Sequence, residues 1–406
     1  MEEFVRAKNV KKSILFIMLG LALVLISKSA SGGSVSAAFD TLACDGRAGI
    51  GKCIFTKFPG NKKHVPEHAK GNPYVGGIEA KITWAELEPE KGKYAWEKID
   101  DFLSECAKYD LQAAFKFWTV SGKVMSDGQL AKGKGRAGPD VVYRNTDTPP
   151  WLFQDPSVKK LGGFMTPKGR LPYYPVFRDK AYQKHLEEFI VAFARRYDGH
   201  PRIEYIRIGG WQILTNEPSF YGGASEFLVD QLLEQGMDVR GKEKDLKIMR
   251  NLPGDSPYSI AVLDMMDIWY RHFKKTRLGV TVHPSKEQGS FEDVQMKHAF
   301  EKKALIVNTG LNEADKSSMR QLYRQAYEKH GCKVGWGDLT HVGRHGKERE
   351  LQKKGISLWR EIARQAVGSD IDPQYTPASK ISYVIFSSTA LKDVEATKWL
   401  YEHLVR

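Results

Sequence analysis

The chain alternates between short apolar segments and longer amphipathic ones, and this alternation limits its possible folds more than any other feature. In the longer segments apolar residues recur at helical spacing, as Trp96, Ile99 and Phe102 do, which is typical of a helix with one buried face. The shorter segments are rich in β-branched and aromatic residues, which favours strands. The expected strands cover residues 53–58, 77–84, 111–120, 203–217, 278–283, 304–309, 332–338 and 381–387. The expected helices cover residues 96–109, 178–197, 259–274, 291–302, 317–330, 348–367 and 394–404.

Eight strands alternating with helices over roughly 350 residues predict an α/β fold, a single (β/α)8 TIM barrel that spans residues 45–406. Long insertions are expected after strand three, at residues 121–176, and after strand four, at residues 219–257. A doubly wound sheet would carry a glycine-rich turn after its first strand. The glycine-rich run at 46–51 precedes the first strand instead, so the barrel is the better interpretation.

The N-terminus has the pattern of a targeting segment. Basic residues precede an uninterrupted apolar run at 14–26, and small residues follow it. Thirteen apolar residues are short for a membrane span and suit the core of a signal peptide. We expect residues 1–37 to be a signal peptide cleaved after Ala37, or an N-terminal anchor through residues 13–27 if cleavage fails. The protein would then be secreted or periplasmic, with membrane contact only through an uncleaved leader.

Composition excludes few functions. The formal net charge is +13, which favours acidic polymers or anionic surfaces. However, Lys and Arg are spread along the chain, and no nucleic-acid-binding module is recognisable. The chain has no Cys-x-x-Cys pair and no His-rich cluster, so we expect no metal, and no cofactor is indicated. In an exported protein Cys44 and Cys53 could form a disulfide, although their spacing does not establish one.

Residues at the C-terminal ends of barrel strands are the functional candidates, because barrel enzymes build their sites there. Asn216 and Glu217 come at the end of the fourth expected strand, which Pro218 terminates. A glutamate in that position suits general acid/base chemistry if its surroundings raise its pKa. Glu79 and Lys81 lie within the second strand, and we expect one of them to join a polar network inside the barrel. The other strand-end candidates are Lys57, Trp84, Glu86, Lys116, Trp118, His283, Asn308, Trp336, Asp338 and His341.

The segment from Trp84 to Asp100 carries a motif of Trp84, Leu87-Glu88-Pro89, Gly92, Tyr94 and Trp96. Further along are Pro149-Pro150-Trp151 and Asn216-Glu217-Pro218. In this order and spacing the three pieces resemble the β-galactosidase and cellulase type of barrel glycoside hydrolase, clan A, over residues 77–223. That clan keeps an acid/base on strand four and a nucleophile on strand seven.

The resemblance implies a two-carboxylate mechanism. Glu217 would protonate the glycosidic oxygen and later deprotonate water, and Asn216 would bind a sugar hydroxyl. A carboxylate from strand seven would attack the anomeric carbon from about 5 Å away in a retaining enzyme. The residues expected to contact sugar are Trp84, Trp118, Trp151, Tyr174, His283 and Trp336.

The sequence departs from this pattern at strand seven. The clan has glutamate there, whereas this chain has Asp338, whose side chain is one methylene shorter. Asp338 could act as the nucleophile, or it could activate a water across a wider gap of about 6.5–9.5 Å and give inversion. A third possibility is that hydrolysis has been lost, and Glu313 is a reserve candidate for the second carboxylate. The expected function is therefore an exported glycoside hydrolase acting on an oligo- or polysaccharide, with acidic glycans among the candidate substrates. One alternative is a carbohydrate-binding barrel without catalysis. Another is a basic exported protein that binds an anionic cell-surface polymer, with the barrel as its scaffold.

Overall fold

The computed structural model describes twelve stretches of the chain. They are residues 54–57, 65–120, 147–162, 165–166, 169–170, 173–209, 253–282, 288–308, 317–339, 357–367, 381–386 and 390–404.

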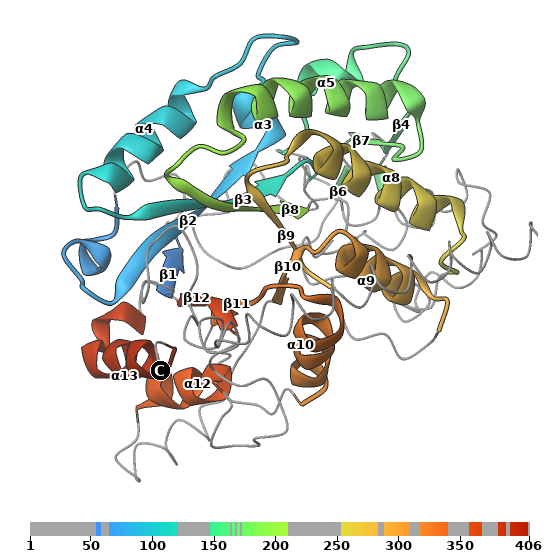
Figure 1. The fold of residues 1–406 in the computed structure, drawn as a ribbon. Coiled ribbons are helices and arrows are strands. Elements are labelled where there is room, and N and C mark those ends of the chain that lie inside the picture. Colours follow the sequence, from blue (N-terminus) through green and yellow to red (C-terminus); the bar gives the residue numbers. More distant parts are fainter. Residues whose placement is uncertain are drawn as a thin grey trace, which may run out of the picture. The chain divides into compact units, whose positions relative to one another are not determined.

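Eight parallel strands form a closed barrel in the order β1-β12-β11-β10-β9-β8-β3-β2, and β2 pairs with β1 to close it (Figure 1). The strands are β1 (Ile54–Lys57), β2 (Val75–Thr83), β3 (Gln112–Trp118), β8 (Ile203–Gly209), β9 (Arg277–Val280), β10 (Leu305–Asn308), β11 (Val334–Leu339) and β12 (Ile381–Phe386). The predicted barrel is therefore confirmed, with the eight expected strands in the expected order.

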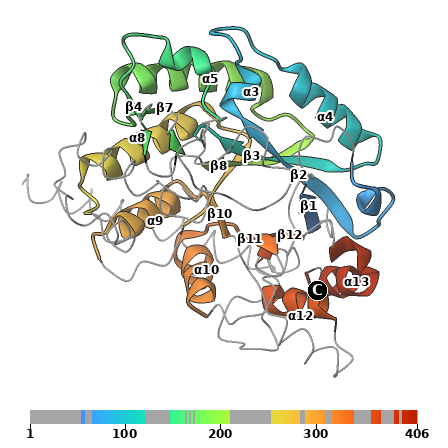
Figure 2. The ribbon, with the colours of Figure 1, turned by 180° about the vertical axis from the view of Figure 1, so that it is seen from behind.

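Helices lie outside the ring of strands in both views (Figures 1 and 2). They are α3 (Trp84–Leu87), α4 (Glu97–Ala107), α5 (Lys180–Tyr197), α8 (Pro257–His272), α9 (Phe291–Glu301), α10 (Ser317–His330), α12 (Leu358–Val367) and α13 (Val394–Leu404). Short 3-10 helices are η1 (Glu67–Ala69), η3 (Pro150–Phe153) and η5 (Ala390–Lys392). Two small antiparallel pairs, β4 (Lys160–Gly162) with β7 (Tyr173–Pro175) and β5 (Met165–Thr166) with β6 (Gly169–Arg170), follow η3.

Side-chain caps fix where several helices begin. Asp179 accepts a hydrogen bond from the backbone N–H of Tyr182 at the start of α5. Ser256 does the same for Ser259 in α8, where Pro257 occupies the first helical position. These caps satisfy N–H groups that have no partner within the helix, typically worth about 1 kcal/mol each.

Two expected elements extend beyond the described residues. The fourth strand was expected to reach Glu217, and β8 is described as far as Gly209, which pairs with Trp118 at the end of β3. The helix expected at 348–367 is described only from Leu358. Residues 210–252, which hold most of the second insertion, lie outside the described residues, as do 121–146 of the first insertion.

The core has two parts, separated by the strands. Odd and even residues of a strand face opposite sides, so Ile206 of β8 packs against the helices whereas Tyr205 points into the barrel. The outer core is aromatic: Phe189 of α5 stacks on Phe117 of β3 and also meets Trp96. The inner cluster consists of Phe55, Ala114, Tyr205, Leu305, Val307, Tyr383 and Ile385, each at most 1% exposed.

A glycine makes room for the inner cluster. A Cβ atom added to Gly77 of β2 would lie 2.2 Å from the Phe55 ring and 2.7 Å from the backbone oxygen of Gln112. Both distances are far below van der Waals contact, so only glycine lets Phe55 fill the centre of the barrel at this level.

Candidate functional site

The barrel interior contains a buried ion pair next to the inner apolar cluster. Arg207 of β8 and Glu79 of β2 form a salt bridge of 2.8 Å, and each side chain is 2% exposed. The Tyr205 hydroxyl donates to the other carboxylate oxygen of Glu79 at 3.1 Å. A buried charge is costly unless it is paired and hydrogen-bonded, and here both conditions are met for the carboxylate. The pair links β2 to β8, the strand that precedes Asn216 and Glu217.

A second polar contact joins Tyr383 of β12 to β8 and β9. The Tyr383 hydroxyl of β12 donates to Glu204 of β8, and Arg277 of β9 donates to the same hydroxyl. The Tyr205 and Tyr383 rings meet at a centroid distance of 5.0 Å. Together with Phe55 they fill the barrel at this level, so it is a packed core and not a channel.

The next row toward the C-terminal strand ends is cationic. Lys81 of β2 pairs in register with Lys116 of β3, and Lys116 pairs with Arg207. Residues paired in register on adjacent parallel strands point to the same face, so these three side chains share the barrel interior. Above them, Thr83 pairs with Trp118. The two lysines of this row differ from the inner cluster in exposure. The Lys81 side chain is 38% exposed and Lys116 is half-buried, as is Trp118, whereas Arg207 is 2% exposed.

The two lysines of this row lie against one indole. The Nζ atom of Lys81 is 4.2 Å from the centroid of Trp118, and that of Lys116 is 4.9 Å from the same centroid. Each contact is a cation–π interaction worth about 0.5–1 kcal/mol at a partly exposed site. Among the five aromatic candidates for sugar contact that the structure describes, Trp118 is the one in an inward-facing position of the barrel.

Asp147 joins the first insertion to the open end of the barrel. Lys81 Nζ lies 2.9 and 3.2 Å from the two carboxylate oxygens of Asp147, whose side chain is 2% exposed. The backbone oxygen of Asp147 accepts from Ala85 N–H at 3.0 Å. Next to it, the Thr148 hydroxyl donates to the Thr119 carbonyl at 2.8 Å. These contacts hold residues 147–148 beside the ends of β2 and β3.

The motif that resembles the glycoside hydrolases forms a structural clamp outside the barrel. Glu88 is 4% exposed and accepts from Trp84 Nε1 at 2.7 Å and from Gly92 N–H at 2.8 Å. Burial raises the pKa of Glu88, and the two hydrogen bonds oppose that rise. Gly92 has a φ of +74°, in the left-handed region that favours glycine. The motif therefore shapes the connection between β2 and α4.

Trp84 and Trp151 belong to this clamp. Trp84 is fully buried and meets Phe189 of α5 at 5.7 Å. Trp151 of η3 donates from Nε1 to the Glu88 carbonyl at 3.0 Å, and its ring stands edge-on to Trp84 at 6.1 Å. Trp84 therefore packs in the outer core and does not stack on a sugar as expected, because a fully buried ring has no free face. Trp151 is half-buried and fixed by Glu88 on the helix side of β2.

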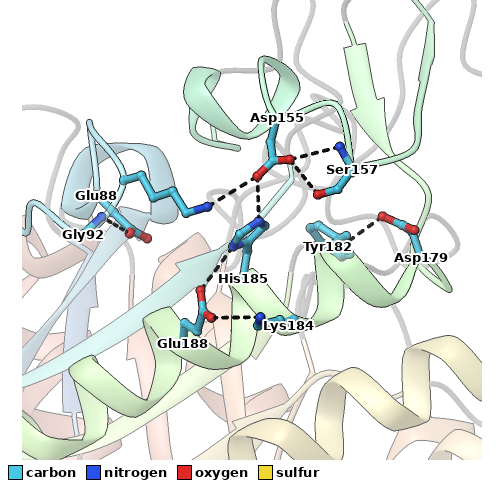
Figure 3. A network of polar contacts seen from close by, with 10 residues as sticks. Glu88, Gly92, Asp155, Ser157, Asp179, Tyr182, Lys184, His185 and Glu188 are labelled. Atoms are coloured by element: carbon cyan, nitrogen blue, oxygen red, sulfur yellow. Dashed lines mark hydrogen bonds and ion pairs between the residues drawn. The ribbon is translucent and has the colours of Figure 1, made fainter.

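Figure 3 shows a polar network that ties the loop after η3 to α5. Asp155 accepts from the Ser157 hydroxyl at 2.6 Å and contacts His185 Nε2 at 3.1 Å. The other ring nitrogen of His185 lies 3.2 Å from Glu188, and Lys91 contacts Asp155 at 3.3 Å. The hydrogen bonds from Ser157, with those from Lys91 and His185, hold the pKa of Asp155 well below its usual range. The network stabilises the segment that carries Trp151.

Two further aromatic candidates are buried in the outer core. Trp336 of β11 is 1% exposed, meets Tyr323 of α10 at 4.7 Å and donates to the Ala366 carbonyl of α12 at 3.1 Å. It therefore points toward the helices. Tyr174 of β7 is 4% exposed and belongs to the same outer cluster. Both placements correct the expected sugar-contacting role, because neither ring can reach a ligand without unpacking.

The proposed acid/base region lies outside the described residues: Asn216, Glu217, His283 and the reserve candidate Glu313 all fall there, as does His341. The backbone of Asp338 belongs to β11, and its side chain is not described. The pairing of β11 with β12 shifts between Trp336 and Leu339. Strand alternation therefore does not assign a face to Asp338.

Sequence reasoning missed Asp147 and the partner of Glu79. Asp147 lies 66 positions from Lys81, so no local pattern links the two. The sequence did contain a signal for Arg207 as an inward-facing charge. It is a charged residue between Ile206 and Ile208, in a strand whose outward positions are apolar. A charge that faces a barrel interior needs a counter-charge, and Glu79 on a strand two places away was the available one.

Within the described stretches, no group of three or more His, Cys, Asp or Glu side chains is placed to hold a metal ion. No helix in this part of the chain is both long enough and apolar enough to cross a membrane. The predicted leader and the Cys44–Cys53 pair lie outside it, and Cys106 and Cys332 are buried free thiols.

Solved structures were compared with this fold. The chain is similar to the catalytic domain of β-amylase from Paenibacillus polymyxa, with a TM-score of 0.50, 11% identity and coverage of 87% of this chain and 97% of that one. Xylanase B from Clostridium stercorarium F9 gives a TM-score of 0.43 at 12% identity, with 82% and 85% covered. A β-galactosidase from the psychrophilic Marinomonas ef1 gives 0.39 at 12% identity, with 70% and 47% covered. No protein-family model and no curated protein sequence matches the chain.

The class that these observations define is the (β/α)8 barrel of the kind found in glycoside hydrolases. At 11% identity the likeness concerns the fold alone. It agrees with the fold that the sequence resemblance implied.

Proposed function

We propose that the chain is an exported glycoside hydrolase that cleaves O-glycosidic bonds in an oligo- or polysaccharide. Glu217 is the acid/base, Asn216 binds a sugar hydroxyl, and Asp338 is the second carboxylate. The observation that supports this most is the solvent-accessible polar end of the barrel interior, where Lys81 and Trp118 lie beyond a sealed core. Barrel enzymes carry out their chemistry at that end.

The position of β8 also supports the proposal. It is the fourth barrel strand in chain order and pairs with β3 up to Trp118. Asn216-Glu217-Pro218 follows it, in the chain position where clan A barrels keep their acid/base. The buried pair of Glu79 with Arg207 anchors β8 to β2 just before that segment, which would restrict where the segment can begin.

A screen of aryl-glycosides and polysaccharides tests the activity, with the wild type and Glu217→Gln compared on every substrate that is turned over. Loss of general acid catalysis should lower kcat by about 10²–10⁴-fold. An aryl-glycoside with a very good leaving group needs no protonation and should lose less. Glu226→Gln, the same substitution nine positions further on, is the matched control and should keep wild-type turnover. Equal turnover by Glu217→Gln and the wild type on all substrates would remove Glu217 from the mechanism.

The second candidate function is a carbohydrate-binding barrel without catalysis. Asp338 favours it, because it stands where clan A has glutamate. Saturable oligosaccharide binding by a wild type that turns over nothing in the screen would support this function over hydrolysis. For export, N-terminal sequencing of the mature protein should begin at Ala38. An intact leader in the membrane fraction would indicate an anchor instead.

A further inference from the structure

The cationic row is an unusual arrangement for the interior of a barrel. Lys81, Lys116 and Arg207 are direct neighbours on β2, β3 and β8. Like charges side by side on one face of a sheet destabilise it, so packing alone does not favour such a row. Arg207 is sealed by Glu79, with both side chains 2% exposed. The charge that remains accessible is at the open end of the barrel.

The salt bridge of Lys81 with Asp147 presents its positive end to solvent. Asp147 is 2% exposed, whereas the Lys81 side chain is 38% exposed. The carboxylate is therefore shielded, and the ammonium group that it orients is accessible. An ammonium has three N–H donors, and the two Asp147 oxygens occupy at most two of them. One donor can still reach an anion.

Trp118 brings a second cation close to the first. Both Nζ atoms lie within 5 Å of its ring centroid, at 4.2 Å for Lys81 and 4.9 Å for Lys116. Ammonium groups above an indole occupy ring surface that a sugar would need for stacking. The ring therefore serves to orient the two lysines, which changes the role that the sequence suggested for it.

We infer that Lys81 and Lys116 form a subsite for an anionic group carried by a sugar of the substrate, with Asp147 and Trp118 as the residues that position them. The inference rests on the proposed carbohydrate substrate and names its class: a glycan with a uronic carboxylate or a sulfate ester. The net charge of +13 adds a long-range attraction for such polymers.

Calorimetric binding to the full chain carrying Glu217→Gln tests the subsite without turnover. The probes are tetragalacturonate, its fully methyl-esterified form, and a sulfated galactan tetrasaccharide with its desulfated counterpart. Each pair shares its sugars and differs in charge. We expect at least one acidic member to bind about tenfold tighter than its neutral partner, and less tightly as salt rises. Which pair shows the preference distinguishes carboxylate from sulfate.

Lysine variants assign the preference to this site. Lys116→Met keeps an apolar stem without the charge and should reduce the acidic-over-neutral ratio about fivefold, whereas Lys116→Arg should retain most of it. Lys81→Met is combined with Asp147→Asn, so that no buried carboxylate loses its partner, and should reduce the ratio similarly. Lys93→Met removes a charge from a side chain that is 73% exposed on the β2–α4 connection and should change nothing. Circular dichroism and melting temperature verify that each variant folds.

The outcomes separate this inference from the proposed hydrolysis. An acidic preference that Lys116→Met abolishes supports the subsite even if the wild type turns over nothing. Equal binding of acidic and neutral partners, no binding of any acidic probe, or an equal loss in Lys93→Met would overturn it, even if the wild type hydrolyses a glycan. Single-stranded DNA of the same charge that binds as tightly as the best acidic probe would overturn the assignment to sugars.

Discussion

Arg207 of β8 and Glu79 of β2 form a salt bridge of 2.8 Å across β3, inside the barrel and almost wholly out of contact with water. The pair separates the packed inner cluster from the accessible lysines and Trp118 beyond it. Because the pair lies between these two layers, its removal tests how much the stability of the barrel depends on it.

We predict that breaking this pair on one side destabilises the fold strongly. Glu79→Gln leaves the guanidinium of Arg207 buried without the Glu79 counter-charge. Arg207→Met leaves the Glu79 carboxylate buried without the Arg207 counter-charge. Each should lower the free energy of unfolding by about 3–5 kcal/mol, measured by urea denaturation. The double variant should lose less than the sum of the two single losses, because neither orphaned charge remains. Additive losses would mean that the two side chains act independently.

Gly92 offers a test of the clamp that the Trp84–Trp96 motif forms. Its φ of +74° strains any residue with a Cβ atom, and its N–H donates to Glu88. Gly92→Ala should therefore cost about 1–2 kcal/mol of unfolding free energy. Gly92→Asn should cost less, because asparagine tolerates the left-handed region better. Equal losses for the two variants would point to a cause other than backbone strain.

The Asp155 network predicts a stability that depends on pH. A carboxyl whose folded-state pKa is depressed adds stability above its unfolded pKa of about 3.9 and loses it as pH falls through the folded value. Hydrogen bonds from Ser157 depress the pKa of Asp155 in this way. Asp155→Asn should therefore lower the melting temperature at pH 7, and the difference from the wild type should shrink progressively below pH 4. Asp101→Asn, on an exposed position of α4, is the control. A deficit that stays constant to pH 3 would contradict the prediction.

The sequence predicted the barrel well because its signals are local. One of Glu79 and Lys81 was expected to join a polar network inside the barrel, and the structure shows that both side chains do. Trp336 was assigned to sugar contact because it lies near the C-terminal end of a strand, and this assignment was wrong. Gly335 carried the missing signal: a Cβ atom there would lie 3.0 Å from the Tyr383 carbonyl oxygen. Gly335 takes the inward position beside Tyr383, so Trp336 faces the helices.

The site itself was less predictable, because its contacts are distant in sequence. Glu79 and Arg207 are 128 positions apart, and Lys81 and Asp147 are 66 apart. The Trp84–Trp96 motif indicated the right fold, although its role in the structure is packing and not the sugar contact that was expected of Trp84. Its residues hold the β2–α4 connection through Glu88, and Trp84 is fully buried among them.

The last prediction concerns the partner of Glu217. If Asp338 is the second carboxylate, Asp338→Asn should lower kcat by about 10³-fold or more, and adding Glu217→Gln should cost little beyond the larger single loss, since the two act as a unit. Glu313→Gln is the matched test of the reserve candidate and should keep near-wild-type turnover.

Proton NMR of the first product anomer then distinguishes the mechanisms. A retained configuration requires direct attack by a carboxylate about 5 Å from Glu217, and an inverted one requires a water between carboxylates about 6.5–9.5 Å apart. Because an aspartate is one methylene shorter than the glutamate of clan A, inversion is the outcome that a β11 backbone held at the usual depth would give. Retention would instead mean that the strand shift between Trp336 and Leu339 carries Asp338 closer to the sugar. Full activity of Asp338→Asn with loss in Glu313→Gln would transfer the role to Glu313.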